Sequence, residues 1–252
     1  MRTHHVLIAA AAGIAVLIAL LLGWAIGHRE DVPDRRPLAR AQVSDLSEAV
    51  ESAAPAVVML SAGGTSAADA LPMGSGFVIS PDGYVVTSAR SAGSLPVVTV
   101  IFPSGAAFKA ERIGADPEVD IAVFRTLNTA HEALPAIKLA DSALIRAGQP
   151  VLLLSAPVGL EGTATAGIVS NPARRLDPDR PGDLIQTDAL FAAGSAGGPL
   201  INADGEVIGV ATPRIRMGES IASVAFATPS NAVRAAVDRL KAAAGAQPVP
   251  AR

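Results

Sequence analysis

Imidazoles are scarce among the side chains that could do chemistry in this chain of 252 residues. The histidines are His4, His5, His28 and His131, and cysteine is absent. The absence of cysteine excludes disulfides, thiolate-bound zinc and a thiol nucleophile. The first three histidines flank an apolar N-terminal run, so a reaction that needs an imidazole elsewhere depends on His131. This histidine lies in a polar stretch that we interpret as a solvated loop.

The composition argues against nucleic-acid binding. Aromatic residues make up 3% of the chain, and the formal net charge is −3. Few rings are therefore available to stack on bases, and no net positive field attracts phosphates. Apolar residues make up 50% of the sequence, which is typical of a chain with a folded core.

An uncharged apolar run, Val6–Gly27, predicts a membrane-spanning helix. At ~1.5 Å per residue it would be about 33 Å long, close to the ~30 Å hydrocarbon core of a bilayer. A cleaved signal peptide is the alternative interpretation. Arginines are more numerous after the run than before it, which opposes a periplasmic location for the rest of the chain.

Four parts are predicted along the chain. Residues 1–27 form the membrane anchor, and residues 28–41, which are charged and contain prolines, form a linker. Residues 42–245 form one domain, and residues 246–252 form a short tail. A domain of about 200 residues is large enough for two lobes with a substantial core.

Short runs of β-branched residues recur through the predicted domain. Two pairs of runs are joined by turns that end in Asp-Gly, at residues 80–83 and 202–205. Further strands are expected at residues 56–60, 97–102, 121–125, 151–155, 167–170 and 224–227. This spacing favours an all-β barrel or sandwich. Two helices, Ser44–Ala53 and Pro229–Ala244, are expected to flank the strands, the second capped by Thr228.

Three segments resemble the HtrA/DegP family of trypsin-like serine proteases. They are Gly74–Arg90, Gly114–Val123 and Ile185–Leu200, and the last of them ends in Gly-Ser-Ala-Gly-Gly-Pro-Leu. The similarity extends from about Asp45 to Leu240 with the family's order and spacing. The resemblance implies an all-β fold, a trypsin-like double β-barrel made of two six-stranded antiparallel barrels with flanking helices. We expect no PDZ domain to follow it.

Carried over position by position, the resemblance places Arg90, Asp120 and Ala196 at the histidine, aspartate and serine of the family's triad. A guanidinium has no acceptor nitrogen and alanine has no hydroxyl, so neither side chain can do its counterpart's chemistry. We therefore predict that the triad is degenerate and that the chain is not an enzyme. We also expect Arg90 and Asp120 to form an ion pair that ties the two lobes together.

The resemblance also implies a backbone nest like an oxyanion hole at Gly194, Ser195 and Ala196, because such a nest does not depend on side chains. A relaxed loop is the alternative. Ser195 lies one residue before the position of the nucleophile, and without a base its hydroxyl is a poor nucleophile. A rearranged site that used Ser195, or a residue from a partner, would make the chain an active serine endopeptidase.

Two short segments correspond to the family's peptide-binding regions. The residues are Leu190, Phe191, Ala192, Ser223, Val224 and Ala225. The second segment matches a strand that pairs with the substrate backbone in active relatives, although core packing explains Val224 and Phe226 equally well. We expect no metal and no cofactor, because His131 alone cannot form the histidine pair known from inactive members of the family.

Together these features predict a membrane-anchored, catalytically inactive serine protease homologue of the bacterial cell envelope. It would bind a protein or peptide as a scaffold or regulator. The expected location is the inner membrane, crossed once by residues 6–27, with the domain in the periplasm. A second copy of the chain is a further expected partner, and nucleic acid is not.

Overall fold

The computed structural model describes residues 46–64, 69–127, 133–156, 162–176, 182–213 and 224–245. The chain divides between Ser44 and Asp45 into two units, and all the described residues belong to the second unit. Among them, no helix is long and apolar enough to span a membrane. The predicted anchor, residues 6–27, lies outside the described residues.

The first half of the domain is a closed antiparallel barrel in the order β1-β2-β3-β6-β5-β4. Its strands are β1 (Val57–Ser61), β2 (Pro72–Ser80), β3 (Tyr84–Ser88), β4 (Val97–Ile101), β5 (Ala107–Asp116) and β6 (Ile121–Thr126). The predicted turn between β2 and β3 is present, and Gly83 has φ +89° there while its N–H donates to the Ser80 carbonyl. Glycine adopts this backbone conformation without steric cost.

The second half is a closed antiparallel barrel in the order β10-β11-β12-β9-β8-β7. Its strands are β7 (Pro150–Ser155), β8 (Thr163–Arg174), β9 (Leu184–Thr187), β10 (Pro199–Ile201), β11 (Val207–Ala211) and β12 (Ala225–Pro229). The turn between β10 and β11 is closed by Asn202, whose side-chain oxygen accepts from the N–H groups of Asp204 and Glu206. Two six-stranded barrels confirm the predicted all-β double barrel.

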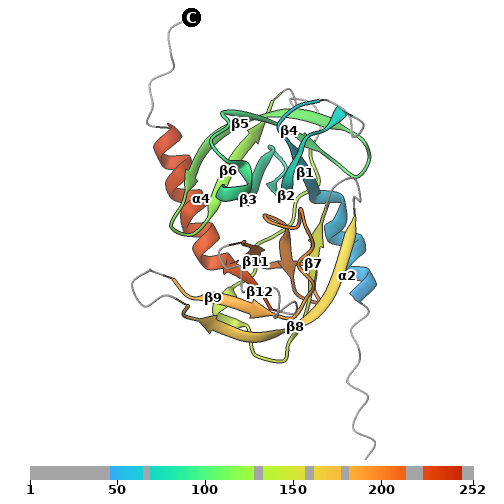
Figure 1. Ribbon diagram of the computed structural model, residues 1–252, viewed down its shortest axis with the longest axis vertical. Coiled ribbons are helices and arrows are strands. Elements are labelled where there is room, and N and C mark those ends of the chain that lie inside the picture. The colour runs from blue at the N-terminus through green and yellow to red at the C-terminus, as the bar shows by residue number, and fades with distance from the viewer. Residues whose placement is uncertain are drawn as a thin grey trace, which may run out of the picture. The chain divides into compact units, whose positions relative to one another are not determined.

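Helices flank the barrels at both ends of the described chain, namely α2 (Leu46–Ala53), followed by the 3₁₀ turn η1 (Ala54–Ala56), and α4 (Ser230–Gly245). The short α3 (Ala89–Ala92) lies between β3 and β4, and the 3₁₀ turn η3 (Ser142–Leu144) lies between β6 and β7. Figure 1 shows α4 running alongside β5 and β6 and on to β11 and β12, so this helix packs on both barrels.

The predicted start of the C-terminal helix is wrong by one residue. Thr228 and Pro229 end β12, where they pair with Val210 and Gly209 of β11. The Thr228 hydroxyl donates to the Val119 carbonyl. Strand pairing therefore takes the two residues that were expected to begin the helix.

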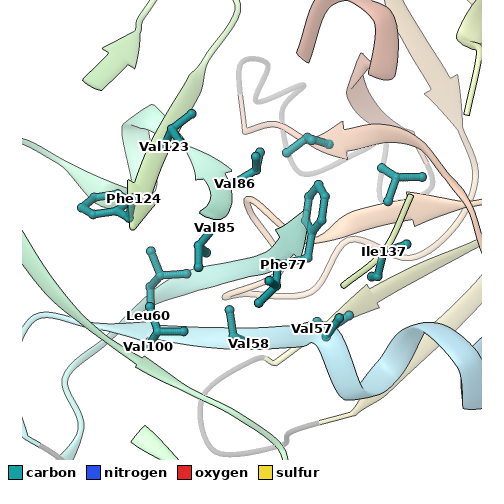
Figure 2. Close-up of a cluster of buried hydrophobic side chains, with 14 of the residues drawn as sticks. Val57, Val58, Leu60, Phe77, Val85, Val86, Val100, Val123, Phe124 and Ile137 are labelled. Atoms are coloured by element: carbon teal, nitrogen blue, oxygen red, sulfur yellow. The ribbon is translucent and has the colours of Figure 1, made fainter. Parts of the chain in front are cut away.

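The core of the first barrel consists mainly of β-branched and aromatic side chains. Figure 2 shows Phe77 of β2 among residues of β1, β3, β4 and β6. Phe77 and Phe124 are fully buried. Burial of one such side chain contributes roughly 1.5–3 kcal/mol. The cluster extends into α2 and α4 and includes side chains of the second barrel, such as Leu154 of β7 and Val210 of β11, so it joins the two barrels. The second barrel also has a cluster of its own, which includes Val151, Val169 and Ile208.

Candidate functional site

Asp120 lies at the junction of the barrels, in the turn between β5 and β6, and is 1% exposed. It is the only non-glycine residue with positive φ, at +59°, in the described ranges. Its carboxylate accepts from the Ser88 hydroxyl at 3.0 and 3.1 Å and from the Arg90 backbone N–H at 2.9 Å. It also accepts from the Thr212 hydroxyl at 2.6 Å. Since Thr212 follows β11, this carboxylate links the two barrels.

The predicted ion pair between Arg90 and Asp120 is wrong. Arg90 is exposed, and only its backbone N–H reaches the carboxylate. In the described part of the chain, the ion pairs are Arg175 with Asp183 at 3.1 Å and Arg239 with Asp116 at 2.7 Å. Asp120 is turned into the protein, where two hydroxyls and one N–H already supply its hydrogen bonds.

The loop between β9 and β10 is held by its own backbone and by β11. The Ser195 N–H donates to the Ala192 carbonyl at 3.1 Å, and the Gly198 N–H donates to the Ser195 carbonyl at 2.9 Å. The Gly197 N–H donates to the Ala211 carbonyl at 2.8 Å. The loop is therefore ordered on the side of the second barrel.

A residue of the first barrel, Ser75 of β2, holds the same loop from the other side. Its hydroxyl donates to the Gly194 carbonyl at 2.8 Å, and its N–H donates to the Ala196 carbonyl at 2.9 Å. Within the described residues, the N–H groups of Gly194 and Ala196 donate no hydrogen bond. Both residues are half-buried. These two N–H groups are the ones expected to form the nest.

The side chain of Ser195 is directed to the second barrel. It is 1% exposed, and its hydroxyl donates to the Ser155 hydroxyl, at the end of β7, at 3.1 Å. A second hydroxyl is not a base, so this arrangement does not activate Ser195.

The first segment that was predicted to bind a peptide, residues 190–192, follows β9. Leu190 is 58% exposed, while Phe191 and Ala192 are half-buried. Phe191 packs against the cluster of the second barrel, and the Thr165 hydroxyl donates to the Leu190 carbonyl at 2.9 Å. The segment thus offers an exposed apolar side chain on a fixed backbone.

The second segment that was predicted to bind a peptide is described in part, because Ser223 lies outside the described residues, as does His131. Val224 is half-buried, and Ala225 is buried and pairs with Thr187 of β9. On its other side, β12 pairs with β11 only over Ala227–Pro229. Val224 and Ala225 therefore extend beyond the paired part of β11.

Two charged residues of β5 support the turns around the site. Burial lowers the pKa of Arg112, whose guanidinium donates to the carbonyls of Leu95 and Gly93 at 2.9 and 2.6 Å. Burial alone would raise the pKa of Asp116, but hydrogen bonds from Arg239 and from two backbone N–H groups hold that pKa below its ordinary value. Both side chains fix loops that lead to Asp120 or Arg90.

Sequence reasoning missed Ser75 and Thr212. The sequence does carry a signal for Ser75, because it stands between two glycines in a strand pattern, which marks a close approach of backbone. A Cβ on Gly74 would lie 2.8 Å from the Ala196 carbonyl oxygen. No group of three or more His, Asp or Glu side chains able to hold a metal occurs in the described ranges.

Comparison with known proteins identifies the family. The model of the trypsin-like peptidase domain matches residues 74–210. The chain belongs to this family. A probable periplasmic serine endoprotease, DegP-like, from Marinomonas sp. (strain MWYL1) is 38% identical over 169 residues, which are 67% of this chain and 35% of that protein. The mitochondrial serine protease HTRA2 of Bos taurus is 39% identical over 203 residues, which are 77% of this chain and 43% of that protein.

Solved structures of the HtrA-type protease AlgW share the trypsin-like double barrel. AlgW with a decapeptide has a TM-score of 0.66 and 27% identity, covering 78% of this chain and 66% of that one. A variant of AlgW with a tripeptide has a TM-score of 0.67 and 31% identity, covering 78% and 63%. The predicted membership of the HtrA-type trypsin-like protease family is confirmed. The chain spans less than half the length of the two curated relatives.

The comparisons contradict the prediction that this chain is not an enzyme. The matched relatives are named serine endoproteases or serine proteases, and both structural neighbours are HtrA-type proteases. That prediction relied on transferring single positions, Arg90 and Ala196, from the family pattern. The alternative stated beside it, a rearranged site that uses Ser195, agrees better with these relatives.

Proposed function

We propose that the chain is an HtrA-type serine endopeptidase with a rearranged catalytic site at the junction of the barrels. The observation that carries this proposal is the pair of N–H groups of Gly194 and Ala196, which have no acceptor in the described residues. Two such donors, placed about 3 Å from a carbonyl oxygen, stabilise the negative charge that develops on it during attack. The protease names of the matched relatives support the same activity.

The substrate is an extended polypeptide. Both AlgW structures hold a peptide, a decapeptide and a tripeptide. In this chain, Val224 and Ala225 lie beyond the paired part of β11, where an extended chain can add backbone hydrogen bonds. The exposed side chain of Leu190 provides an apolar contact on the neighbouring loop. These features support recognition of a peptide with an apolar residue near the bond that is cut.

The attacking hydroxyl comes from a residue other than Ala196, which has none. We assign it to Ser195, whose backbone lies between the two N–H groups of the nest. To reach a peptide, this side chain has to leave its hydrogen bond to Ser155. Arg90 cannot accept a proton and the Ser155 hydroxyl is not a base, so in this assignment the proton of the Ser195 hydroxyl passes to solvent water.

The test uses the purified full-length chain, unfolded casein and a fluorophosphonate probe. We expect new casein fragments and a labelled protein, and we expect both signals to disappear in Ser195→Ala. Ser104→Ala is the matched control, because Ser104 is exposed in the turn between β4 and β5. Neither fragments nor label from the unmodified chain would overturn the proposal, and label that persists in Ser195→Ala would overturn the assignment of Ser195.

We further propose that residues 6–27 anchor the chain in the bacterial inner membrane with the domain in the periplasm. The uncharged apolar run and the periplasmic name of the DegP-like relatives support this location. A periplasm-dependent reporter fused after Arg252 should be active, and the fusion should resist extraction by carbonate. If only a cytoplasm-dependent reporter is active after Arg252, the domain lies in the cytoplasm and the proposed orientation is wrong. Sedimentation of the detergent-solubilised chain tests the expected self-association.

A further inference from the structure

Ser75 is a buried polar residue that belongs to one barrel and serves a loop of the other. It lies in β2 and is 0% exposed. Besides donating to the Gly194 carbonyl, its hydroxyl accepts from the Ala156 N–H, just after β7, at 2.9 Å. Its backbone N–H donates to the Ala196 carbonyl at 2.9 Å. One small residue therefore contacts three backbone groups of the second barrel.

These contacts fix the orientation of two peptide planes. A peptide unit is planar and trans, so a carbonyl held on one side directs the following N–H to the other side. The Gly194 carbonyl is held by Ser75, and the following Ser195 N–H meets the Ala192 carbonyl. The Ala196 carbonyl is held by Ser75, and the following Gly197 N–H meets Ala211. The Ala196 N–H belongs to the peptide unit between these two planes, whose Ser195 carbonyl accepts from the Gly198 N–H, and the Gly194 N–H belongs to the unit just before the first plane.

We propose that Ser75 is a positioning residue, which holds the N–H groups of Gly194 and Ala196 as a pair that binds a negatively charged oxygen. This inference rests on the proposed function, because the same pair forms the nest described there. A peptide that ends in a carboxylate carries such an oxygen, as the product of peptide hydrolysis does. Hydrogen bonds to a charged oxygen are shorter and stronger than those to a neutral one. The unmodified chain therefore prefers a peptide acid over the corresponding amide.

The experiment compares a fluorescein-labelled hexapeptide ending in valine, as the free acid and as its C-terminal amide, by fluorescence anisotropy. We expect the full-length chain to bind the acid about tenfold more tightly than the amide, as two charge-assisted hydrogen bonds allow. In Ser75→Ala we expect that ratio to fall below about threefold, whereas Ser104→Ala should keep it. If Ser75 had a merely structural role, Ser75→Ala would lower the melting temperature and weaken the binding of both peptides equally.

Two results would overturn the inference. One is an acid-to-amide ratio that Ser75→Ala leaves unchanged, and the other is the absence of any preference in the unmodified chain. If Ser75→Ala does not fold, amide NMR of the unmodified chain decides, because the acid should shift the Gly194 and Ala196 resonances more than the amide does. Shifts confined to other residues would reject the proposal. The anisotropy assay measures binding and not cleavage, so a failure to cleave casein would not affect this test of Ser75.

Discussion

At the junction of the barrels, the carboxylate of Asp120 has three hydrogen-bond donors within 3.1 Å, whereas the N–H groups of Gly194 and Ala196 have no acceptor in the described residues. Both regions are made by contacts across the barrels, through Thr212 in one case and Ser75 in the other. The first region is a closed polar network, and the second is an ordered loop with open donors. A satisfied network stabilises the fold, whereas ordered open donors are available to a ligand. Substitutions in these two regions should therefore distinguish effects on the stability of the fold from effects on ligand binding.

The largest effect is expected for Asp120→Ala. The change leaves the Ser88 and Thr212 hydroxyls and the Arg90 N–H without their acceptor in a buried site, where each unsatisfied group costs about 1–3 kcal/mol. We expect the free energy of unfolding to fall by about 4 kcal/mol, measured by urea denaturation. Asp238→Ala, on the exposed face of α4, is the control and should change it by less than about 0.5 kcal/mol. A loss below 1 kcal/mol for Asp120→Ala would show that the network is not closed.

Gly197→Ala should disturb the open region, which is the loop that carries the Gly194 and Ala196 N–H groups. Gly197 has φ +88°, and an added Cβ would collide with the backbone oxygen of Ser75. Gly148→Ala is the matched control, because Gly148 has φ +85° with no atom within 4 Å of its added Cβ. We expect a loss of about 1 kcal/mol for the control, from the backbone conformation alone, and about 3 kcal/mol for Gly197→Ala. Anisotropy should also show a loss of the acid preference in Gly197→Ala only, and equal effects of the two variants would contradict the clash.

Thr212→Val tests the link between the barrels with little change in shape. It removes the hydroxyl that donates to Asp120 at 2.6 Å. We expect a loss of about 2 kcal/mol in the free energy of unfolding, because the acceptor is a carboxylate. Thr126→Val is the control, since its buried hydroxyl donates at 3.3 Å to the neutral carbonyl of Gly83, and it should cost about 1 kcal/mol or less. If peptide binding falls while stability is unchanged, Thr212 belongs to the open region instead.

The smallest effect concerns the pH dependence of Asp116. Because its pKa is lowered in the folded chain, its contribution is present above the ordinary carboxyl pKa and is lost as the pH falls through the lowered value. The Arg239 side chain is 61% exposed, so solvent screens the pair, and Asp116→Asn should cost only about 0.5 kcal/mol near neutral pH and nothing in acid. Denaturation curves at several pH values check this. Arg239→Gln should give a similar profile, and a loss that persists in acid would exclude the electrostatic cause.

The strands that the sequence predicted are those whose pattern is strong by itself. β3 and β11 each follow an Asp-Gly turn, and their β-branched residues are buried. β5 was missed because Lys109, Glu111 and Arg112 interrupt its apolar pattern. It forms nevertheless, because β4 and β6 pair with it on both sides. Strand propensity is therefore secondary here to pairing with neighbours.

The candidate site was predictable in position but not in its contacts. The motifs identified the turn of Asp120 and the Gly194–Gly198 loop, yet side-chain direction does not follow from spacing. For that reason the sequence predicted a guanidinium at Asp120, where the structure has the Arg90 backbone N–H. The assignment of Arg90, Asp120 and Ala196 to the catalytic positions of the family stays a prediction.

The hydrogen bond from Ser75 to Gly194 joins residues that are 119 positions apart. During synthesis at roughly 5–20 residues per second, Gly194 follows Ser75 out of the ribosome on the order of ten seconds later. β2 is therefore synthesised well before the loop to which it is hydrogen-bonded. A nascent chain cannot form these contacts with the Gly194–Ala196 loop before most of both barrels has been translated.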